Sequence, residues 1–435
     1  MTRTSFGFVA GLLAALSGCG RAQPTSTADD RIPEEALRPI TGGETRYLAF
    51  QIFEGGPDPA IPFDRPPLVY TPAVKVAAMA RDIVATIGTT GSQRAMLAVI
   101  LGPISFDHTD AEARQIIDDG FAIARAENIA VGFHIDDSMF WSKRTDLMGD
   151  PANVEWTDFA GTRASGLKLD WAHPPARMCF NAPSIRSEVT RRARDVIGAR
   201  IRSHVATLQT EGKESLFGGV IAGWETHMGH DVSTDSPVGF HALANRGFGP
   251  GNPPADVGAE IASIVAEFVD LWTTGLTQGG INPARIYTHV SFLTRTKYAE
   301  FVATGTVPAS MTYETLVNRL PSSQHPSVAF AASARPGFST YPTAGLFEQI
   351  AEERLLHGNP AWASSEGTNL LPPGPAGNSN MSMETYLARS FNHGATLVTV
   401  YSWGIGGASL RHTNPFRIVT EGPEALAAYR RFLTQ

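Results

Sequence analysis

Short apolar runs rich in β-branched or aromatic residues recur along the chain, and most are followed by a segment with the hydrophobic spacing of a helix. This alternation is typical of parallel strands joined by crossover helices. The runs predict eight strands, at 47–53, 95–101, 130–135, 218–224, 285–292, 327–332, 361–365 and 396–403. The intervening patterns predict helices at 72–87, 110–127, 184–209, 256–278, 343–357 and 382–392.

Eight strands of this spacing fit either a (β/α)8 barrel or an open doubly wound sheet. No Gly-x-Gly-x-x-Gly or Walker-type loop follows any of the predicted strands, which disfavours a nucleotide-binding sheet. Polar residues instead follow the ends of many different strands, as in barrel enzymes, whose sites are built at the C-terminal rim. The sequence therefore predicts a single-domain (β/α)8 TIM barrel over residues 46–435.

The polar residues at the predicted strand ends are expected to face one mouth of this barrel, because the carboxyl ends of parallel strands meet there. In chain order they are Glu54, Asp107, His108, His134, Asp136, Asp137, Glu225, His227, His289, Arg335, Tyr341 and Glu366, with the aromatic Trp403 at the end of the eighth strand.

The first 18 residues have the layout of a secretory signal, with an apolar run over 6–16 that is too short for the roughly 20 residues of a membrane-spanning helix. The run ends in Leu16-Ser17-Gly18-Cys19, which resembles a bacterial lipobox. The resemblance implies cleavage before Cys19 and a lipid anchor on that residue. Gly20 follows, which in a Gram-negative cell favours the outer membrane. Residues 19–45 lack hydrophobic periodicity and predict a flexible tether.

Charge and cysteine content narrow the range of partners. The net charge of −7 is spread over interspersed acidic and basic residues without a Lys/Arg block, so nucleic acid is not an expected partner. Cys179 is the only cysteine besides Cys19, so lipidation would leave the mature chain without a disulfide. A membrane contact is expected through the lipid alone, and Cys179 is expected to be a buried packing residue.

Glu225 and Glu366 each directly follow an apolar run, in Val-Ile-Ala-Gly-Trp-Glu-Thr-His and Ala-Trp-Ala-Ser-Ser-Glu-Gly-Thr. This placement resembles clan A glycoside hydrolases, barrel enzymes with an acid/base Glu after strand four and a nucleophile Glu after strand seven. The resemblance covers most of the mature chain but lies in placement rather than in close motifs, so it names no single family. It implies retaining cleavage of a poly- or oligosaccharide without a cofactor, with Glu225 as acid/base and Glu366 as nucleophile.

Many clan A members carry Asn immediately before the acid/base, where it binds the sugar 2-hydroxyl, whereas this chain has Trp224. The contact to that hydroxyl is therefore unassigned. Aromatic faces near strand ends can pack on sugar rings while polar neighbours bind the hydroxyls. Trp403 is the first choice, since clan A barrels often carry a Trp at the end of strand eight under the sugar. The predicted substrate-binding residues are Asp136, Asp137, Trp141, Trp224, His227, His289, Arg335, Tyr401 and Trp403.

Two other functions stay open. Asp136, Glu225, His227, His289 and Glu366 are the residue types that a divalent-metal barrel hydrolase or isomerase would need, although no compact motif such as His-Glu-x-x-His supports a metal. The chain could also be a non-catalytic carbohydrate-binding lipoprotein. A serine hydrolase is disfavoured, because no Gly-x-Ser-x-Gly elbow occurs.

Overall fold

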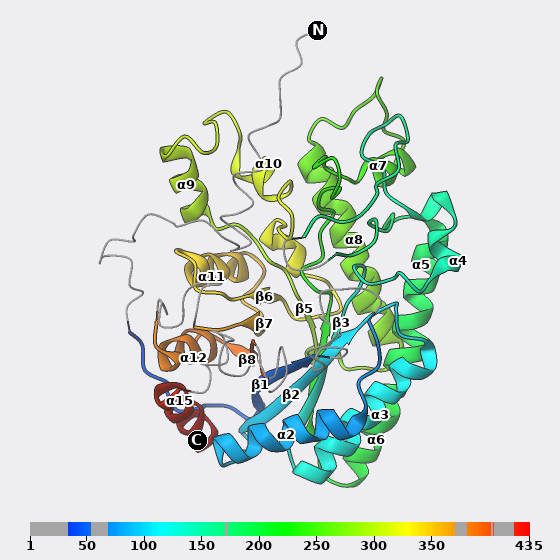
Figure 1. Cartoon of the computed structure of the whole chain (residues 1–435). Coiled ribbons are helices and arrows are strands. Elements are labelled where there is room, and N and C mark those ends of the chain that lie inside the picture. Colours follow the sequence, from blue (N-terminus) through cyan, green and yellow to red (C-terminus); the bar gives the residue numbers. More distant parts are fainter. Residues whose placement is uncertain (1–33, 54–67, 170–172, 370–380, 402, 404–421) are drawn as a thin grey trace.

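The chain folds as a ring of eight parallel strands surrounded by helices (Figure 1). The computed structural model describes residues 34–53, 68–169, 173–369, 381–401, 403 and 422–435. The strands are β1 (Arg46–Phe53), β2 (Ala95–Ile104), β3 (Ala130–Ile135), β4 (Phe217–Ala222), β5 (Ile286–Thr288), β6 (Gly337–Ser339), β7 (Trp362–Gly367) and β8 (Ala395–Val400). Hydrogen-bonded neighbours follow the order β5-β4-β3-β2-β1-β8-β7-β6.

The two ends of this order meet and nearly close the barrel. Parallel bridges join Tyr287 to Arg335 and Val290 to Phe338. The Val290 N–H also donates to the Gly337 carbonyl at 3.0 Å. Both β5 and β6 are only three residues long, so this seam depends on a few bonds beside the regular strands. The architecture is the predicted single-domain (β/α)8 TIM barrel.

The predicted sixth strand is wrong. Residues 327–332 do not extend, because Pro326–Ala329 forms the 3₁₀ helix η5, in which the His325 side chain accepts the Ser327 N–H. Pro326 occupies the first turn, where its fixed φ suits a helix and its missing N–H costs nothing. The apolar residues Val328 and Ala329 are buried all the same. The apolar run therefore predicted burial correctly but not an extended backbone. The actual β6 follows this run in the sequence.

Helices follow most strands and cover the outside of the barrel (Figure 1). The predicted helix at 184–209 is one continuous helical stretch whose middle turn is π-helical, the segment η2 (Arg192–Gly198). The α-helices are α2 (Ala73–Ile87), α3 (Asp110–Glu127), α4 (Thr145–Met148), α5 (Pro183–Arg191), α6 (Ala199–Thr210), α7 (Phe240–Asn245), α8 (Val257–Gln278), α9 (Arg295–Ala303), α10 (Tyr313–Val317), α11 (Leu346–Leu356), α12 (Met383–Phe391) and α15 (Pro423–Leu433). Further 3₁₀ turns are η1 (Pro151–Asn153), η3 (Glu214–Leu216) and η4 (Pro283–Arg285).

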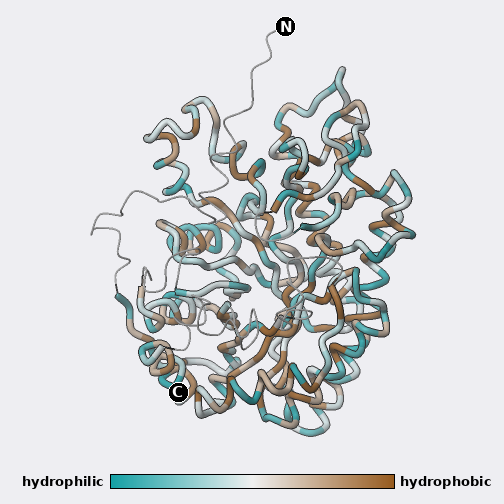
Figure 2. The backbone as a smooth tube through the Cα atoms, in the orientation of Figure 1, coloured by the Kyte–Doolittle hydropathy of each residue, from teal (hydrophilic) through white to brown (hydrophobic). Residues whose placement is uncertain are grey.

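The core lies in and around the barrel wall. Every residue of β2, β3, β4, β7 and β8 is buried, as expected for parallel strands covered on both faces. Figure 2 shows hydrophobic stretches along these strands and more hydrophilic residues on the surrounding helices. The barrel wall is therefore rigid, so polar groups at its strand ends are held by packing as well as by hydrogen bonds.

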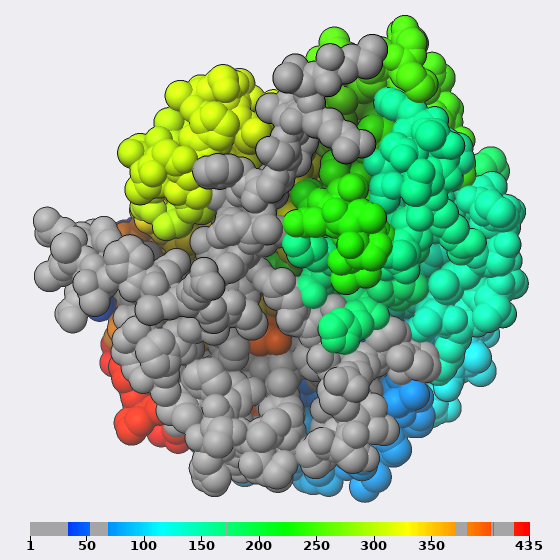
Figure 3. All heavy atoms as spheres, turned by 45° about the horizontal axis from the view of Figure 1, so that its top comes forward, coloured from blue at the N-terminus to red at the C-terminus, as the bar shows by residue number. Residues whose placement is uncertain are grey.

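Long connections rise beyond the strands on one side of the molecule. Residues 136–169 and 173–182 follow β3, and the bridge between Leu167 and Asp231 ties them to the segment after β4. Figure 3 shows these cyan-to-green residues on one side of that face and the yellow residues of the α9–α10 region on the other. This elaborated face is the one to which the carboxyl ends of the strands lead.

The segment 34–45, which is the described part of the predicted tether, packs on the barrel. The Arg38 N–H donates to Asn392 Oδ1 at 3.0 Å, and the Ile40 N–H donates to Gln435 Oε1 at 2.9 Å. Packed chain thus begins before residue 46. The predicted signal, Cys19 and Glu54 lie outside the described residues. Among the described helices, none combines the length and the apolar character needed to cross a bilayer.

Candidate active site

Glu225 and Glu366 meet at the carboxyl end of the barrel. Glu366 belongs to β7, whereas Glu225 follows β4 in a sharp turn in which Gly223 has φ +100° and Glu225 itself φ +49°. A left-handed backbone is costly for a residue other than glycine and persists only where the surroundings enforce it. The enforced turn brings the Glu225 carboxyl toward β6, where Ser339 Oγ donates to Oε1 at 2.6 Å.

The two carboxyls are electrostatically coupled. Burial raises the pKa of Glu225, and hydrogen bonds from Ser339 and Ser291 oppose that rise. Burial also raises the pKa of Glu366, and the charge of Glu225 raises it further. Two carboxylates that share a buried site cannot both ionise easily, so the pair retains one proton after the first carboxyl has ionised. The site thus offers one acid and one carboxylate together.

The two oxygens of Glu366 have different surroundings. The Tyr341 hydroxyl donates to Oε1 at 2.9 Å, whereas Oε2 is buried without a hydrogen-bond partner among the described residues. Hydrogen bonds from Tyr341 and Trp224 favour the ionised carboxyl. Burial, then the charge of Glu366, raises the pKa of Tyr341 well above its ordinary value, so this phenol remains a donor at any ordinary pH.

Trp224 and Tyr401, two of the predicted substrate-binding aromatics, lie beside the carboxyl pair. Trp224 belongs to a small apolar cluster that Tyr401 packs against. The rings of Tyr401 and Tyr341 meet edge to face at 6.1 Å. Burial raises the pKa of Tyr401 well above its ordinary value, and the charges of Glu366 and Glu225 add to the rise. These two residues therefore form an apolar wall with a phenol beside the carboxyls.

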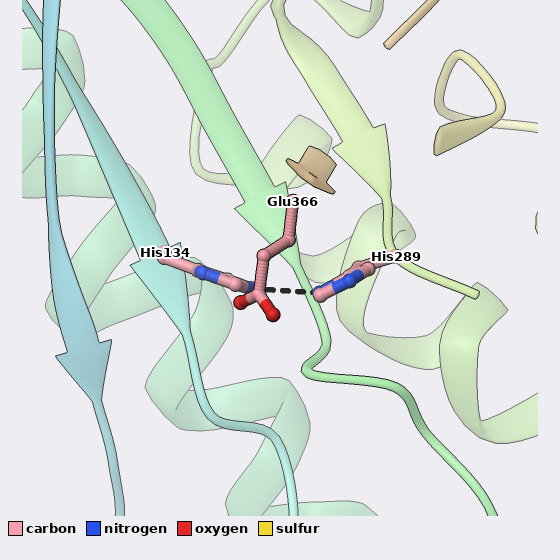
Figure 4. Close-up of side chains that lie close together, drawn as sticks. All are labelled: His134, His289 and Glu366. Carbon is pink, nitrogen blue, oxygen red and sulfur yellow. Dashed lines mark hydrogen bonds between the residues drawn. The ribbon is translucent and has the colours of Figure 1, made fainter. Parts of the chain in front are cut away.

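His289, which directly follows β5, and His134 of β3 lie close to the Glu366 carboxyl (Figure 4). His134 Nε2 and His289 Nδ1 are 3.1 Å apart. One potential ligand atom from each ring and one carboxylate oxygen of Glu366 lie within 4.8 Å of one another. Burial lowers the pKa of His134 to about 3 and that of His289 well below its ordinary value, so both rings are neutral.

Asp136 and Asp137, predicted to bind substrate, are buried and organise the loops around Glu225. Asp136 accepts the N–H groups of Met139 at 2.9 Å and Phe140 at 2.7 Å. Asp137 accepts the hydroxyl of Thr226, the residue after Glu225, at 2.5 Å. Both carboxylates therefore accept hydrogen bonds from the protein itself. Asp136 thus holds its own loop after β3, and Asp137 holds the turn that carries Glu225.

His227 has a similar place. Its Nδ1 lies 2.6 Å from the Glu225 carbonyl, and its Nε2 lies 3.3 Å from Arg177 Nη2. A carbonyl only accepts and a guanidinium only donates, so Nδ1 carries the ring proton and Nε2 accepts. Burial, then the charge of Arg177, lowers the pKa of His227 to about 3. A neutral His227 thus fixes the backbone of Glu225.

Trp141 and Trp403 are almost fully buried away from the carboxyls. Trp141 donates its indole N–H to the Ala176 carbonyl at 3.0 Å. Trp403 donates to Asp82 of α2 at 3.0 Å and packs edge to face on Phe50 at 5.1 Å. The indole of Trp403 therefore faces the layer between barrel and helices, and the structure does not bring it to the carboxyl pair.

Arg335 lies at the opposite end of the barrel from the place predicted. It precedes β6, and its Nη1 donates to Glu44 at 2.6 Å and to Thr396 at 3.1 Å. Glu44 precedes β1 and Thr396 begins β8, so both mark the N-terminal end of the strands. The misplacement of Arg335 follows directly from the wrong sixth strand, because a residue expected after that strand in fact comes before it.

Sequence reasoning missed the hydroxyl donors of the site. Ser339 and Ser291 were given no role, and Tyr341 was named only as a residue at a strand end. Placing β6 over Gly337–Ser339 would have shown Ser339 at its end and Tyr341 two residues later. The remaining strand-end residues serve structure: Asp107 accepts the Leu68 and Lys143 N–H groups at 2.9 Å, and Cys179 is buried as expected.

No known protein family and no curated protein matches this chain by sequence. Among solved structures, the catalytic domain of β-amylase from Paenibacillus polymyxa matches with a TM-score of 0.50 at 9% identity, over 90% of this chain and 98% of that one. A β-galactosidase from the psychrophilic Marinomonas ef1 gives 0.49 at 12% identity, over 89% of this chain and 59% of that one. The chain thus spans less than two thirds of that β-galactosidase.

A family 5 xyloglucanase from Paenibacillus pabuli gives a TM-score of 0.39 at 10% identity, over 90% of this chain and 98% of that one. At identities this low the β-amylase match shows the fold alone. The fold and the site define a TIM-barrel protein with two interacting carboxyls, one buried and one partly buried, at the carboxyl end of its strands.

Proposed function

We propose that this protein is a retaining glycoside hydrolase that cleaves a poly- or oligosaccharide, with Glu225 as acid/base and Glu366 as nucleophile. The observation that carries the proposal is the position of these two carboxyls, one in β7 and one just after β4, close enough that the charge of Glu225 raises the pKa of Glu366. Hydrolysis by double displacement needs one protonated carboxyl and one ionised carboxylate on either side of the bond.

In the first step Glu366 Oε2 forms a bond to the anomeric carbon as the bond to the leaving oxygen breaks. The proton of Glu225 goes to that oxygen, so the leaving sugar departs as an alcohol. In the second step Glu225, now ionised, takes a proton from water, whose oxygen displaces Glu366 from the anomeric carbon. The hydrogen bonds of Tyr341 and Trp224 support this assignment, because they favour the ionised form of Glu366, which is the form that attacks.

The proposal also assigns the sugar-binding surface that the described residues supply. Tyr401 offers its ring and its hydroxyl beside the carboxyls, and Trp224, which is buried in the same small apolar cluster, supports that ring. Asp136, Asp137 and His227 are withdrawn from direct sugar contact, because their polar atoms hold the protein's own loops. The identity of the sugar is left to experiment.

The direct test is turnover of a panel of aryl glycosides and cell-envelope polysaccharides, with the anomer of the first product followed by NMR. The proposal expects hydrolysis with the anomeric configuration of the substrate retained. A first product of inverted configuration would contradict the retaining mechanism. Binding of a glycan without turnover of any panel member would instead favour the alternative of a non-catalytic carbohydrate-binding protein.

A divalent-metal hydrolase or isomerase is the second candidate, and the cluster of His134, His289 and Glu366 is the observation that favours it (Figure 4). Two imidazoles and a carboxylate are a known ligand set for catalytic zinc. Asp136 and His227, expected in such a site, lie outside this cluster, because Asp136 holds the amides of its own loop and His227 holds the backbone of Glu225. Activity that survives dialysis against EDTA, with no restoration needed from Zn²⁺ or Mn²⁺, would exclude this candidate.

We also propose that the protein acts outside the cytoplasm and is anchored through Cys19, since Leu16-Ser17-Gly18-Cys19 resembles a lipobox. Substitution Cys19→Ala should release the protein from the membrane fraction, because a lipid anchor needs the thiol. Cell fractionation and mass spectrometry of the mature N-terminus measure this. Wild-type protein that is fully soluble and carries an unmodified Cys19 would refute the anchor.

A further inference from the structure

Four polar side chains from separate strands form a continuous hydrogen-bonded chain that ends on Glu225. Gln51 Nε2 of β1 lies 3.1 Å from His134 Nδ1, and His134 Nε2 lies 3.1 Å from His289 Nδ1. His289 Nε2 lies 2.8 Å from Ser339 Oγ, which donates to Glu225 Oε1 at 2.6 Å. Gln51, His134, His289 and Ser339 are all buried. Barrel interiors at this position usually hold branched apolar residues, so a buried hydrogen-bonded polar layer requires an explanation.

The Gly223 carbonyl, as an acceptor, sets the direction in which the hydrogen bonds between Gln51 and Glu225 are donated. The Gly223 carbonyl lies 2.9 Å from His134 Nε2 and can only accept a hydrogen bond, so Nε2 carries the ring proton. The neutral His134 then has a bare Nδ1, which accepts from the Gln51 amide. The Gly223 carbonyl also lies near His289, but its well-formed bond is the one to His134 Nε2 at 2.9 Å. We therefore assign a bare Nδ1 to His289, since two protons pointing at each other over 3.1 Å would repel.

The same reasoning continues to the carboxyl. A neutral His289 with a bare Nδ1 carries its proton on Nε2, which donates to Ser339 Oγ. The single proton of the Ser339 hydroxyl is then left for Glu225 Oε1. Each group in the chain donates toward Glu225, and Oε1 is an acceptor in both ionisation states of the carboxyl. When Glu225 is protonated, the proton consequently resides on Oε2.

We propose that His289, acting through Ser339, is a positioning residue that keeps the acidic proton of Glu225 on Oε2 and stabilises the carboxylate after that proton has left. This inference rests on the proposed function, because it gives the acid/base its preferred oxygen. It also replaces the sequence-based expectation that His289 binds substrate, since both of its nitrogens are used within the protein. The series of hydrogen bonds orients the Glu225 carboxyl, and no proton has to move along it.

The first test reads the tautomers without any substrate. In ¹⁵N-edited NMR of the wild-type protein, His134 and His289 should each carry one proton, on Nε2, between about pH 5 and 8. This measurement stands even if the protein proves not to hydrolyse glycosides. A proton on His289 Nδ1, or two protons on either ring at pH 7, would overturn the proposed direction. A proton on His134 Nδ1 would also overturn the proposed direction. His134 would need that tautomer to bind a metal through Nε2.

The second test uses Ser339→Ala. Removing a donor to the carboxylate disfavours its ionised form, so the pKa of Glu225 should rise and the alkaline limb of kcat/KM should move to higher pH. We expect kcat/KM on a substrate with a poor leaving group to fall about tenfold to a hundredfold, the usual range for a hydrogen bond to a charged group. The other titratable groups facing Glu225 are Glu366, Tyr341 and Tyr401, which the substitution leaves in place.

Matched variants separate positioning from folding. Ser339→Thr keeps a hydroxyl and should restore the wild-type pH profile, and His289→Gln keeps one donor and one acceptor and should lose less activity than His289→Phe. Ser390→Ala removes a buried hydroxyl that donates to the Tyr386 carbonyl in α12 and should leave the profile unmoved. An unshifted alkaline limb in a folded Ser339→Ala protein would refute the positioning role. If the activity of Glu225→Ala proves independent of the leaving group while the histidine tautomers are as stated, that result would refute the proposed function but not the direction of the hydrogen bonds from Gln51 to Glu225.

Discussion

The two carboxyls of the site are held in opposite ways. Glu366 belongs to strand β7, where the register shifts against both neighbouring strands, and its Oε2 has no hydrogen-bond partner among the described residues. Glu225 sits in a left-handed turn after a strand, and its Oε1 receives the last hydrogen bond of a buried chain. A nucleophile needs an oxygen free to form a covalent bond, whereas an acid/base needs its proton kept on one chosen oxygen. The difference in support matches the difference in role.

The largest expected effect comes from removing the free oxygen. Glu366→Ala should lower turnover of every substrate by several orders of magnitude, because no atom is left to form the glycosyl-enzyme. Added azide should restore part of the rate by attacking from the vacated space, and the glycosyl azide should have the inverted configuration. Steady-state rates and NMR of the product measure both. A small loss, or rescue with retention, would break the assignment of Glu366.

Glu225→Ala should have an effect that depends on the leaving group. General acid assistance is worth about 10² to 10⁴ in rate, so natural glycosides should suffer that loss. A dinitrophenyl glycoside, whose leaving group needs no proton, should keep a much faster first step. The ratio of kcat/KM values for the two substrates measures the contrast. Equal losses on both would remove Glu225 from the acid role.

Tyr341→Phe sharpens the comparison on the Glu366 side. The Tyr341 hydrogen bond lowers the pKa of Glu366, so its loss should raise that pKa and move the acidic limb of kcat/KM to higher pH. We expect about a tenfold to hundredfold loss near the acidic limb. The alkaline limb should move less than in Ser339→Ala, since Tyr341 bonds the other carboxyl. A larger shift of the alkaline than of the acidic limb would contradict this division.

Arg335→Ala should have the smallest effect on activity. Its partners Glu44 and Thr396 lie at the N-terminal end of the strands, remote from the carboxyl pair. Since the Arg335–Glu44 ion pair is partly exposed, its loss should cost about 1 kcal/mol or less in the free energy of unfolding. Urea denaturation and steady-state kinetics measure the two quantities. A drop in kcat of tenfold or more in the folded variant would place Arg335 in the site after all.

The parts of the molecule that the sequence predicted are those set by local pattern. Seven of the strands and the two carboxyls were found because apolar runs end directly before polar residues. The sixth strand was not predicted, because β6 is only three residues long. It consists of Gly337, Phe338 and Ser339 and has one apolar side chain. The nearby run around Val328 is more apolar yet forms η5, whose geometry follows from Pro326 and the His325 cap.

The direction in which each strand-end side chain points could not be predicted. Asp136 turns to the amides of its own loop, and Trp403 turns outward to Asp82 of α2. These choices depend on partners that lie far away in the sequence, such as Thr226 for Asp137. Sequence spacing gives the position of a residue at a strand end, whereas its role depends on which buried polar groups must be paired.

The central claim is that Glu366 forms a covalent bond to the sugar. Incubation with activated 2-deoxy-2-fluoro glycosides, chosen from the sugars that the protein hydrolyses, should trap the glycosyl-enzyme because the second step becomes slow. Mass spectrometry of peptic peptides should then find the added sugar on Glu366 and none in the Glu366→Gln protein. A stable adduct on another residue, or hydrolysis of these reagents with inversion and no adduct, would contradict the account.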